Sequence, residues 1–317
     1  MRFIATTIIR HAPFSHPVSG RIFYGDLIKK TILKEKPVPY PLFPLSDKNP
    51  RGGSRGGRGV GIKDGKIYIA NYDSIIVYDK DLKSTGRITN PLFAGLHEIE
   101  IVKDGIWVAS TWLDLVIKVD FNGKIIYQWY YRNDEDFLRK IKLDAPPVLD
   151  LKNDYRRYLK GGVSVLKLAH VNSVRTYRSN NVVITLGMVT PLKKTAVSGY
   201  VIMLDIDREE ASVLYRRKTG FPMHNARILF DRYILMNDSH RMEVLLIGLK
   251  DKKIKKKIKI PGTWLRGLAV CDKYRIIVGA SPASVYEIDL QKGEITSRFN
   301  LSLNPNEAVH GLAIIDE

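Results

Sequence analysis

Residues 266–270 read RGLAV and residues 310–314 read HGLAI, two similar phrases that begin with a basic side chain and continue as an apolar strand. The same pattern occurs six times along the 317 residues. The other four copies are RGVGI (58–62), HEIEI (97–101), HVNSV (170–174) and HNARI (224–228). A phrase that returns at intervals of this kind indicates an internal structural repeat.

Between these phrases the chain consists of short strands. Apolar and polar residues alternate with period two in segments such as KIYIANY (66–72) and YILMNDS (233–239), and turns rich in Gly, Asp, Asn and Lys separate them. Long helical periodicity is nearly absent outside residues 134–159. The chain is therefore predicted to be all-β.

The spacing of the phrases predicts the architecture. Their basic residues are 39, 73, 54, 42 and 44 positions apart, against about 40 to 50 residues per blade in common propellers. Each phrase opens a set of four strands, so six phrases predict a six-bladed β-propeller in which residues 1–317 form a single domain.

The longest interval contains an insertion at 133–160, in the connection between blades 2 and 3. Its Pro146-Pro147 pair predicts a short helix, a kink and a second helix. The insertion is a candidate docking element for a protein partner or a lid, and the sequence does not separate these two roles.

The last phrase leaves no room for three further strands, but the N-terminal residues supply them. RFIATTII (2–9), GRIFYGDL (20–27) and KKTILKE (29–35) read as three strands without an opening phrase. We expect the last blade to be closed by these N-terminal strands plus the C-terminal strand, which avoids an open sheet edge.

The first strand of each propeller blade lines the central channel, so the six basic residues should form a ring around one mouth. These residues are Arg58, His97, His170, His224, Arg266 and His310. Four of the seven histidines of the chain belong to this ring. Arginine binds sulfate, phosphate or carboxylate through two parallel hydrogen bonds, and histidine serves as acid, base or nucleophile near neutral pH. The ring therefore predicts a site for an anionic small-molecule substrate.

The glycine-rich stretch NPRGGSRGGRG (49–59) leads directly into the first phrase. We expect it to deliver Arg58 to the mouth, with Arg51 and Arg55 reaching over the opening. Further substrate-binding candidates lie in the phrases and in loops that join second and third strands: Asn172, Asn225, Trp112, Asp238, His240 and Arg241. Trp112 either stacks on a ring-bearing substrate or seals two blades.

A metal site is an alternative use of the histidines, because neutral imidazoles suit Fe²⁺, Mn²⁺ or Zn²⁺. Only some of these histidines can converge in a six-fold ring, and the two arginines repel a cation. No sequence-local ligand motif such as H-E-x-x-H supports a metal. We assign no metal ligands from the sequence and leave the cofactor open.

Several longer segments resemble the arylsulfotransferase-like six-bladed propellers. They are HVNSV with VVITLG (170–187), MHNARILFDRYILMNDSHR (223–241), and HEIEIV with GKIIYQW (97–129). The resemblance implies that a sulfuryl group passes through a histidine, with His224 as the nucleophile or general base and His170 and His97 assisting. The arginine that this family carries after the second strand of the H-x-N-S blade is absent at 186–188.

The second half also resembles uncharacterised propeller proteins that carry the phrases H-V-N and P-G-x-x-R-G-L-A, here at 170–172 and 261–269. The predicted function is an enzyme acting on an anionic sulfate or phosphate ester, aromatic or sugar-like, as a transferase, hydrolase or lyase that uses histidine. The alternative is a polyanion-binding or scaffold propeller without catalysis.

The formal net charge of +18, from 51 Lys and Arg against 33 Asp and Glu, would attract any polyanion. Nucleic acid is nevertheless not the favoured partner. The lysine run KDKKIKKKIKI (250–260) is expected on the outermost strand of blade 4, where lysines protect an edge from pairing. Aromatic residues in an RNP-type arrangement are absent from the sequence.

The single cysteine, Cys271, favours a reducing, cytoplasmic location. No apolar run approaches the roughly 18 to 20 residues of a membrane-spanning helix, so we expect no membrane association. The lysine-rich, cysteine-poor composition is typical of proteins from thermophiles.

Overall fold

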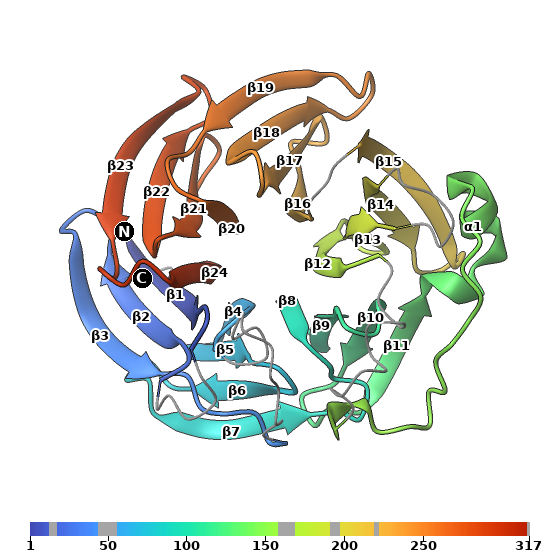
Figure 1. Cartoon of the computed structure of the whole chain (residues 1–317), viewed down its shortest axis with the longest axis horizontal. Coiled ribbons are helices and arrows are strands. Elements are labelled where there is room, and N and C mark those ends of the chain that lie inside the picture. Colours follow the sequence, from blue (N-terminus) through green and yellow to red (C-terminus); the bar gives the residue numbers. More distant parts are fainter. Residues whose placement is uncertain (13–17, 44–55, 158–168, 191–196, 219–221, 316–317) are drawn as a thin grey trace.

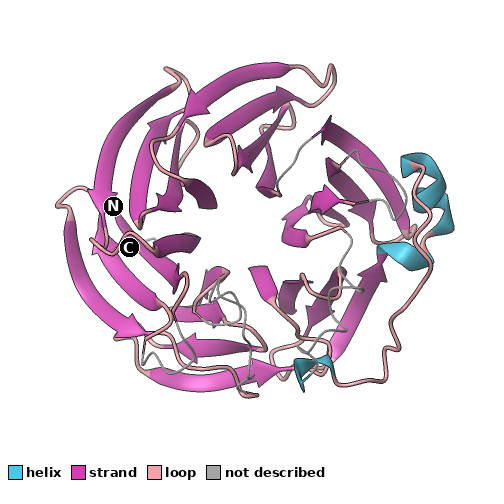
Figure 2. Cartoon of the chain, viewed as in Figure 1, coloured by secondary structure: helices cyan, strands magenta, loops and turns pink. Residues whose placement is uncertain are grey.

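The computed structural model shows a six-bladed β-propeller, which confirms the predicted fold (Figures 1 and 2). It describes residues 1–12, 18–43, 56–157, 169–190, 197–218 and 222–315. Each described sheet has four antiparallel strands, and in each the strand that carries the predicted phrase lies nearest the central axis.

Blades 1 to 3 follow one another along the chain. Blade 1 contains β4 (Val60–Lys63), β5 (Lys66–Ala70), β6 (Ser74–Tyr78) and β7 (Ser84–Thr89). Blade 2 contains β8 (Leu96–Val102), β9 (Gly105–Ser110), β10 (Leu115–Val119) and β11 (Ile125–Tyr130). Blade 3 contains β12 (Val171–Tyr177), β13 (Asn181–Val189), β14 (Ser198–Asp205) and β15 (Glu210–Lys218).

Blades 4 and 5 repeat this order. Blade 4 contains β16 (Met223–Leu229), β17 (Tyr233–Asp238), β18 (Glu243–Gly248) and β19 (Ile254–Lys259). Blade 5 contains β20 (Trp264–Val270), β21 (Arg275–Ser281), β22 (Ser284–Asp289) and β23 (Glu294–Asn300). The lysine run therefore forms β19, the outermost strand of blade 4, as predicted.

Blade 6 joins the two ends of the chain. Its order is β24 (Glu307–Ile315), β1 (Arg2–Ile9), β2 (Arg21–Asp26) and β3 (Thr31–Pro37). The antiparallel register of β1 and β24 runs from Arg2 opposite Ile315 to Ile9 opposite Glu307. This pairing closes the ring, which confirms the expected role of the N-terminal strands.

The core lies between the blades. Among the described residues, six hydrophobic clusters fill the six spaces between neighbouring sheets. Central strands such as β9 are buried along their whole length, because both faces of a central strand pack against adjacent blades. Each fully buried Val, Leu, Ile or Phe contributes roughly 1.5–3 kcal/mol, so inter-blade packing holds the inner strands in fixed positions around the channel.

The insertion after blade 2 forms a short helical segment at the outer rim. It contains η1 (Tyr131–Asn133), α1 (Glu135–Ile141) and η2 (Tyr155–Arg157). Asp134 caps α1 by accepting a hydrogen bond from Phe137 N at 2.8 Å, and α1 lies beside β15, away from the central channel (Figure 1). No described helix is long and apolar enough to span a membrane.

The second helix predicted in the insertion is wrong for the described residues. After α1 the chain is irregular, and η2 is a single 3₁₀ turn. Pro146 and Pro147 disfavour the α conformation in residues 145 and 146, so α1 does not continue through this pair. Residues 158–168 lie outside the described part, and a protein partner on this insertion stays a prediction.

Among the described residues, five of the six inner strands, all except β4, are bulged at or next to the residues that open the phrases. Their registers shift between Leu96 and Ile99 in β8, Val171 and Ser173 in β12, His224 and Arg227 in β16, and Arg266 and Leu268 in β20. In blade 6 the residue skipped is His310 of β24. A bulge adds one residue to a strand and turns side chains to a new direction, so consecutive residues can face the channel.

Candidate functional site

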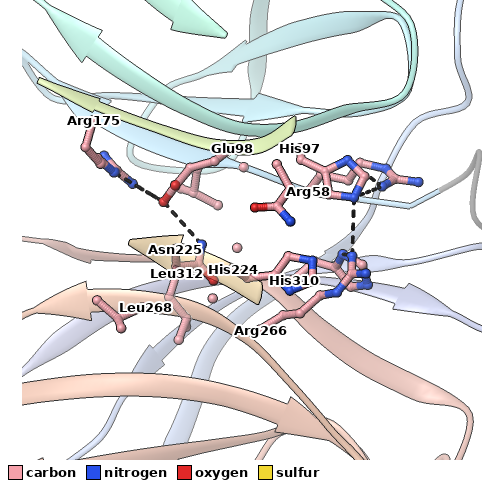
Figure 3. A pocket seen from close by; sticks show the side chains of 15 residues that line it. Arg58, His97, Glu98, Arg175, His224, Asn225, Arg266, Leu268, His310 and Leu312 are labelled. Atoms are coloured by element: carbon pink, nitrogen blue, oxygen red, sulfur yellow. Dashed lines mark hydrogen bonds and ion pairs between the residues drawn. The ribbon is translucent and has the colours of Figure 1, made fainter. Parts of the chain in front are cut away.

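The structure brings all six predicted basic residues to one place. Five of them, Arg58, His97, His224, Arg266 and His310, line one cavity in the channel (Figure 3). The ring of His170 lies beside it, 5.1 Å from the ring of His97 and 5.8 Å from that of His224, centre to centre. The inner strands of the six blades thus bring their basic residues to a shared axis, and in five of these strands a bulge lies at or next to that residue.

The two arginines of this cluster lie against histidines and not against acids. Arg58 Nη1 lies 3.3 Å from both ring nitrogens of His97, and Arg266 Nη1 lies 3.4 Å from His97 Nε2 and 3.1 Å from His310 Nδ1. No carboxylate among the described residues forms an ion pair with either guanidinium. The cavity therefore holds positive charge that the described protein groups do not neutralise.

Burial acts directly on these charges. It lowers the pKa of Arg58 to about 10. Burial, followed by the charges of Arg10 and Arg58, places the pKa of Arg266 well below its usual value. The Nε atoms of Arg58 and Arg266 are buried without a hydrogen-bond partner in the described structure. Since an unsatisfied buried donor costs about 1–3 kcal/mol, these groups favour a ligand that accepts hydrogen bonds and carries negative charge.

Two of the histidines, His97 and His310, are held as neutral rings. Burial, and then the charges of nearby arginines, places the pKa values of His97 and His310 well below their usual range. Nδ1 of His97 lies 3.0 Å from the carbonyl oxygen of Gly95, which only accepts, so Nδ1 carries the hydrogen and Nε2 has a lone pair. Nδ1 of His224 lies 2.7 Å from Ser239 Oγ.

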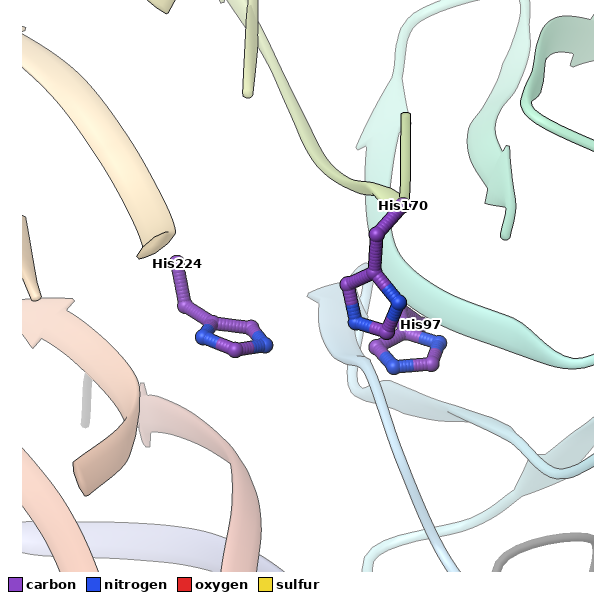
Figure 4. Close-up of side chains that lie close together, drawn as sticks. All are labelled: His97, His170 and His224. Carbon is purple, nitrogen blue, oxygen red and sulfur yellow. The ribbon is translucent and has the colours of Figure 1, made fainter. Parts of the chain in front are cut away.

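Three of the histidines form a compact group, shown in Figure 4. His97, His170 and His224 each offer one ring nitrogen, and these nitrogens lie within 4.8 Å of one another. They come from three successive blades, 2, 3 and 4. Only some histidines of a six-fold ring were expected to converge, and these three do so.

His170 owes its position to Asp114, which the sequence analysis missed. Asp114, in the loop between β9 and β10, accepts hydrogen bonds from Ala169 N at 2.7 Å and Val171 N at 3.2 Å. These bonds flank His170, whose φ of 50° is left-handed. No local pattern connects residues 114 and 170, so the sequence carries no signal for this contact.

The floor of the cavity is a buried ion-pair group around Glu98, a residue whose direction, towards the channel or the neighbouring blade, the sequence leaves open. Glu98 Oε1 accepts hydrogen bonds from Arg175 Nη2 at 2.7 Å and Asn225 Nδ2 at 3.3 Å (Figure 3). Arg227 Nη2 donates to the same oxygen at 3.1 Å. Burial acts to lower the pKa of Arg175, but the carboxylates of Glu98 and Glu100 outweigh it and raise that pKa. Burial lowers the pKa of Arg227 to about 10.

This floor separates two cavities of different size and chemistry. The cavity at the histidine ring has a volume of about 20 Å³, roughly the space of one water molecule. On the other side of the floor lies a cavity of about 290 Å³, whose walls combine apolar residues such as Ile101 and Leu268 with the charged residues Glu100, Arg175 and Arg227. Any substrate larger than an ion must therefore keep most of its body outside the ring.

Two predicted asparagines also line the small cavity. Asn172 donates to Met223 O at 2.6 Å, while its Oδ1 is buried with no hydrogen-bond partner among the described residues. Asn225, at a φ of 59°, accepts from Asn237 Nδ2 at 3.2 Å. Their positions suit contact with a small ligand.

The remaining predicted residues do not line the cavity. Trp112 covers Gly95, where a Cβ would lie 1.4 Å from the indole ring, and packs on the cluster between blades 1 and 2. Asp238 pairs with Arg217 at 2.8 Å and Arg241 at 3.0 Å, and His240 is exposed. Asp238 ends β17, and the other three residues lie in loops between second and third strands, one strand further from the axis. Arg51 and Arg55 lie outside the described residues.

A third arginine adds positive charge at this mouth. The guanidinium groups of Arg10 and Arg266 lie over the ring of Trp264, at 5.0 and 5.3 Å from its centre. The charge of Arg10 contributes to the lowered pKa values of both Arg266 and His310. Arg10 ends a strand and precedes no repeated phrase, so the pattern that located the ring could not find it.

Comparison with known proteins gives the fold and not a family. No protein family model and no curated protein matches this sequence. A solved protein of unknown function from Bacteroides caccae is similar in structure, with a TM-score of 0.60, 10% identity, and 100% of this chain and 99% of that chain covered. A chain of the nidogen/laminin complex has a TM-score of 0.60 and 10% identity, with 98% and 97% covered.

A streptogramin B lyase has a TM-score of 0.47 and 11% identity, with 82% of this chain and 72% of that chain covered. The structural matches therefore include a lyase and a chain from a protein complex. At these identities they establish a shared propeller fold alone, and function has to be argued from the site.

Proposed function

We propose that this protein is an enzyme that acts on an anionic sulfate or phosphate ester, with Arg58 and Arg266 binding the anionic group and the imidazole cluster carrying the reaction. The observation that carries this proposal is the pair of buried guanidiniums without a carboxylate partner in the described structure. Hydrogen bonds from arginine to an oxyanion are charge-assisted and roughly twice as strong as neutral ones.

The histidines supply groups suited to reaction beside such an anion. His97 is neutral, since its pKa is well below the usual range, and its Nε2 lies near both arginines. His224 is oriented through its contact with Ser239 and lines the same cavity. This setting supports the central role that the resemblance to arylsulfotransferases implies for His224.

The size of the cavity restricts the substrate. A space of about 20 Å³ cannot hold an aromatic ring or a sugar. We therefore propose that the anionic group alone approaches the ring, while the rest of the ester lies in the mouth near Arg10 and Trp264. Stacking on the Trp264 side favours planar or ring-bearing esters.

The test combines anion binding with turnover. Sulfate and phosphate binding is measured by calorimetry at low salt, and a panel of aryl and sugar sulfate and phosphate esters is assayed for hydrolysis and transfer. Arg58→Met and Arg266→Met should each weaken anion binding by about 10- to 100-fold, the equivalent of a hydrogen bond to a charged group. Arg241→Met is the matched control, because Arg241 is exposed and lies outside the cavity.

His224→Ala should abolish turnover while leaving anion binding within a few-fold of the wild type. An unchanged anion affinity in both cavity-arginine variants would disprove the binding site. Anion binding without turnover of any ester would contradict the enzymatic role and favour a binding propeller.

A further inference from the structure

We propose that His97, His170 and His224 bind one divalent first-row transition-metal ion, such as Zn²⁺ or Co²⁺, at the channel mouth (Figure 4). Their ring nitrogens lie within 4.8 Å of one another. Metal–nitrogen bonds of about 2.0–2.1 Å place two tetrahedral ligands about 3.4 Å apart. Side-chain rotations that move the ring nitrogens by about an ångström bring them to that separation. Imidazole is a good ligand for this class of metal.

The contacts around the rings suit metal ligands. A metal-binding histidine usually donates its second ring N–H to a neighbouring acceptor, which fixes the ring orientation. The carbonyl of Gly95 serves His97 in this way, at 3.0 Å from Nδ1, and Ser239 Oγ lies 2.7 Å from Nδ1 of His224. The hydrogen on Nδ1 of His97 leaves the lone pair of this ring on Nε2. His170 is held through its backbone by Asp114.

Asn172 is an independent pointer to a ligand at this place. Its side chain lines the small cavity together with His97 and His224, and the residue is 1% exposed. Its Oδ1 has no hydrogen-bond partner among the described residues. An amide oxygen completes a three-histidine site either as a ligand or as the acceptor for a water on the ion.

Arg58 and Arg266 determine the conditions under which a metal ion can bind. Arg58 and Arg266 lie 3.3 and 3.4 Å from His97 Nε2 and would repel a cation. An anion between the guanidiniums and the metal removes this repulsion, and in this respect the inference rests on the proposed function. By thermodynamic linkage, the anion and the metal must strengthen each other's binding by the same factor. His224 is then a metal ligand, so its ring nitrogen does not itself attack the ester.

The experiment titrates EDTA-treated protein with Co²⁺, followed by visible absorption and by metal analysis after equilibrium dialysis, with and without sulfate. We expect one Co²⁺ per chain, an absorption spectrum typical of nitrogen ligands, and tighter binding when sulfate is present. No saturable binding at millimolar Co²⁺ or Zn²⁺, with sulfate present, would overturn the inference.

Variants locate the ion. His97→Ala, His170→Ala and His224→Ala should each weaken Co²⁺ binding by at least the 10- to 100-fold that loss of a supporting residue typically costs. His310→Ala is the matched control, since His310 lines the same cavity but lies outside the group of three. An equal loss of Co²⁺ affinity in His310→Ala, or wild-type Co²⁺ affinity in the three ligand variants, would contradict the assignment.

Two further measurements keep the outcome clear. Ser239→Ala leaves every ligand in place and should still weaken Co²⁺ binding, while circular dichroism confirms that each variant is folded. Arg266→Met should bind Co²⁺ more tightly than the wild type without sulfate and respond less to sulfate. Sulfate binding by metal-free protein tests the proposed function separately: if sulfate binds there and Co²⁺ never does, the metal inference alone fails.

Discussion

The carboxylate of Asp114 fixes His170 from the neighbouring blade, by accepting hydrogen bonds from the backbone N–H groups of Ala169 and Val171. His170 has a φ of 50°. A non-glycine residue in this region costs of order 1–3 kcal/mol and persists only where its surroundings hold it. The acid on blade 2 therefore sets the direction in which a histidine of blade 3 points.

Asp114→Asn should lower the free energy of unfolding by about 1–3 kcal/mol, because one of two buried N–H groups loses its acceptor. Denaturant unfolding measures the loss. Asp120→Asn is a control of the same kind, since Asp120 accepts from two loop N–H groups at an exposed site, and we expect a change within about 0.5 kcal/mol there. Equal losses in the two variants would contradict the special role of Asp114.

The contact between blades 6 and 1 allows no side chain at Gly311. A Cβ on this residue would lie 1.9 Å from the carbonyl oxygen of Arg58. Gly311→Ala should therefore cost about 1–3 kcal/mol, the range for overpacking, and should also weaken anion binding by displacing Arg58. Gly86→Ala, where the nearest atom is 3.9 Å away, should leave the melting temperature almost unchanged. A neutral Gly311→Ala would disprove the close approach.

Glu98 is the countercharge for two buried arginines, Arg175 and Arg227. Glu98→Gln keeps the shape but removes the carboxylate partner of Arg227 and the nearer of two carboxylates beside Arg175, the other being Glu100 at 3.9 Å. Breaking a buried pair in this way costs about 3–5 kcal/mol. Glu287→Gln removes an exposed pairing with Arg275 at 3.4 Å and should cost less than about 1 kcal/mol. Urea unfolding of both variants measures the loss in free energy of unfolding at the two sites. Similar losses would show that the ion pairs of Glu98 do not stabilise the fold more than a surface pair.

Alkaline pH should destabilise the fold through buried tyrosines. Burial raises the pKa values of Tyr78 and Tyr130 from 10.0 to about 12. The unfolded chain loses these protons from pH 10, while the folded protein keeps them, so the stabilisation is complete below pH 10 and declines as pH rises towards 12. Unfolding free energies measured across this range check the sign. The double variant Tyr78→Phe with Tyr130→Phe should show a shallower decline.

The architecture was open to prediction because its signal is local and repeated. The basic opener, the strand after it and the spacing of the six phrases fix the blades, and the three N-terminal strands without an opener account for the closure with β24. The cavity was predicted only in part. Simple alternation puts Glu98 on the face opposite to His97, but the bulge in β8 lets both face the channel.

Other site residues depend on contacts between distant parts of the chain. Arg227 lies 129 residues from the Glu98 that it bonds, and no short pattern connects them. Trp112 illustrates the opposite error. Its type suggested a binding surface, but a glycine at position 95 leaves room for its ring to pack between blades. The ring of arginines and histidines could be predicted from residue type alone. Which other residues line the cavity depends on strand register and on packing between blades.

The pairing of β1 with β24 makes the order of synthesis matter. Thr7 and Glu307, hydrogen-bonded partners in blade 6, are 300 residues apart. On the ribosome, β1, β2 and β3 emerge before β24, so these three strands wait with an unpaired edge until residue 315 has been added. His310 arrives in the cluster at the same moment, so a nascent chain that stalls in blade 5 carries an open ring and an incomplete site.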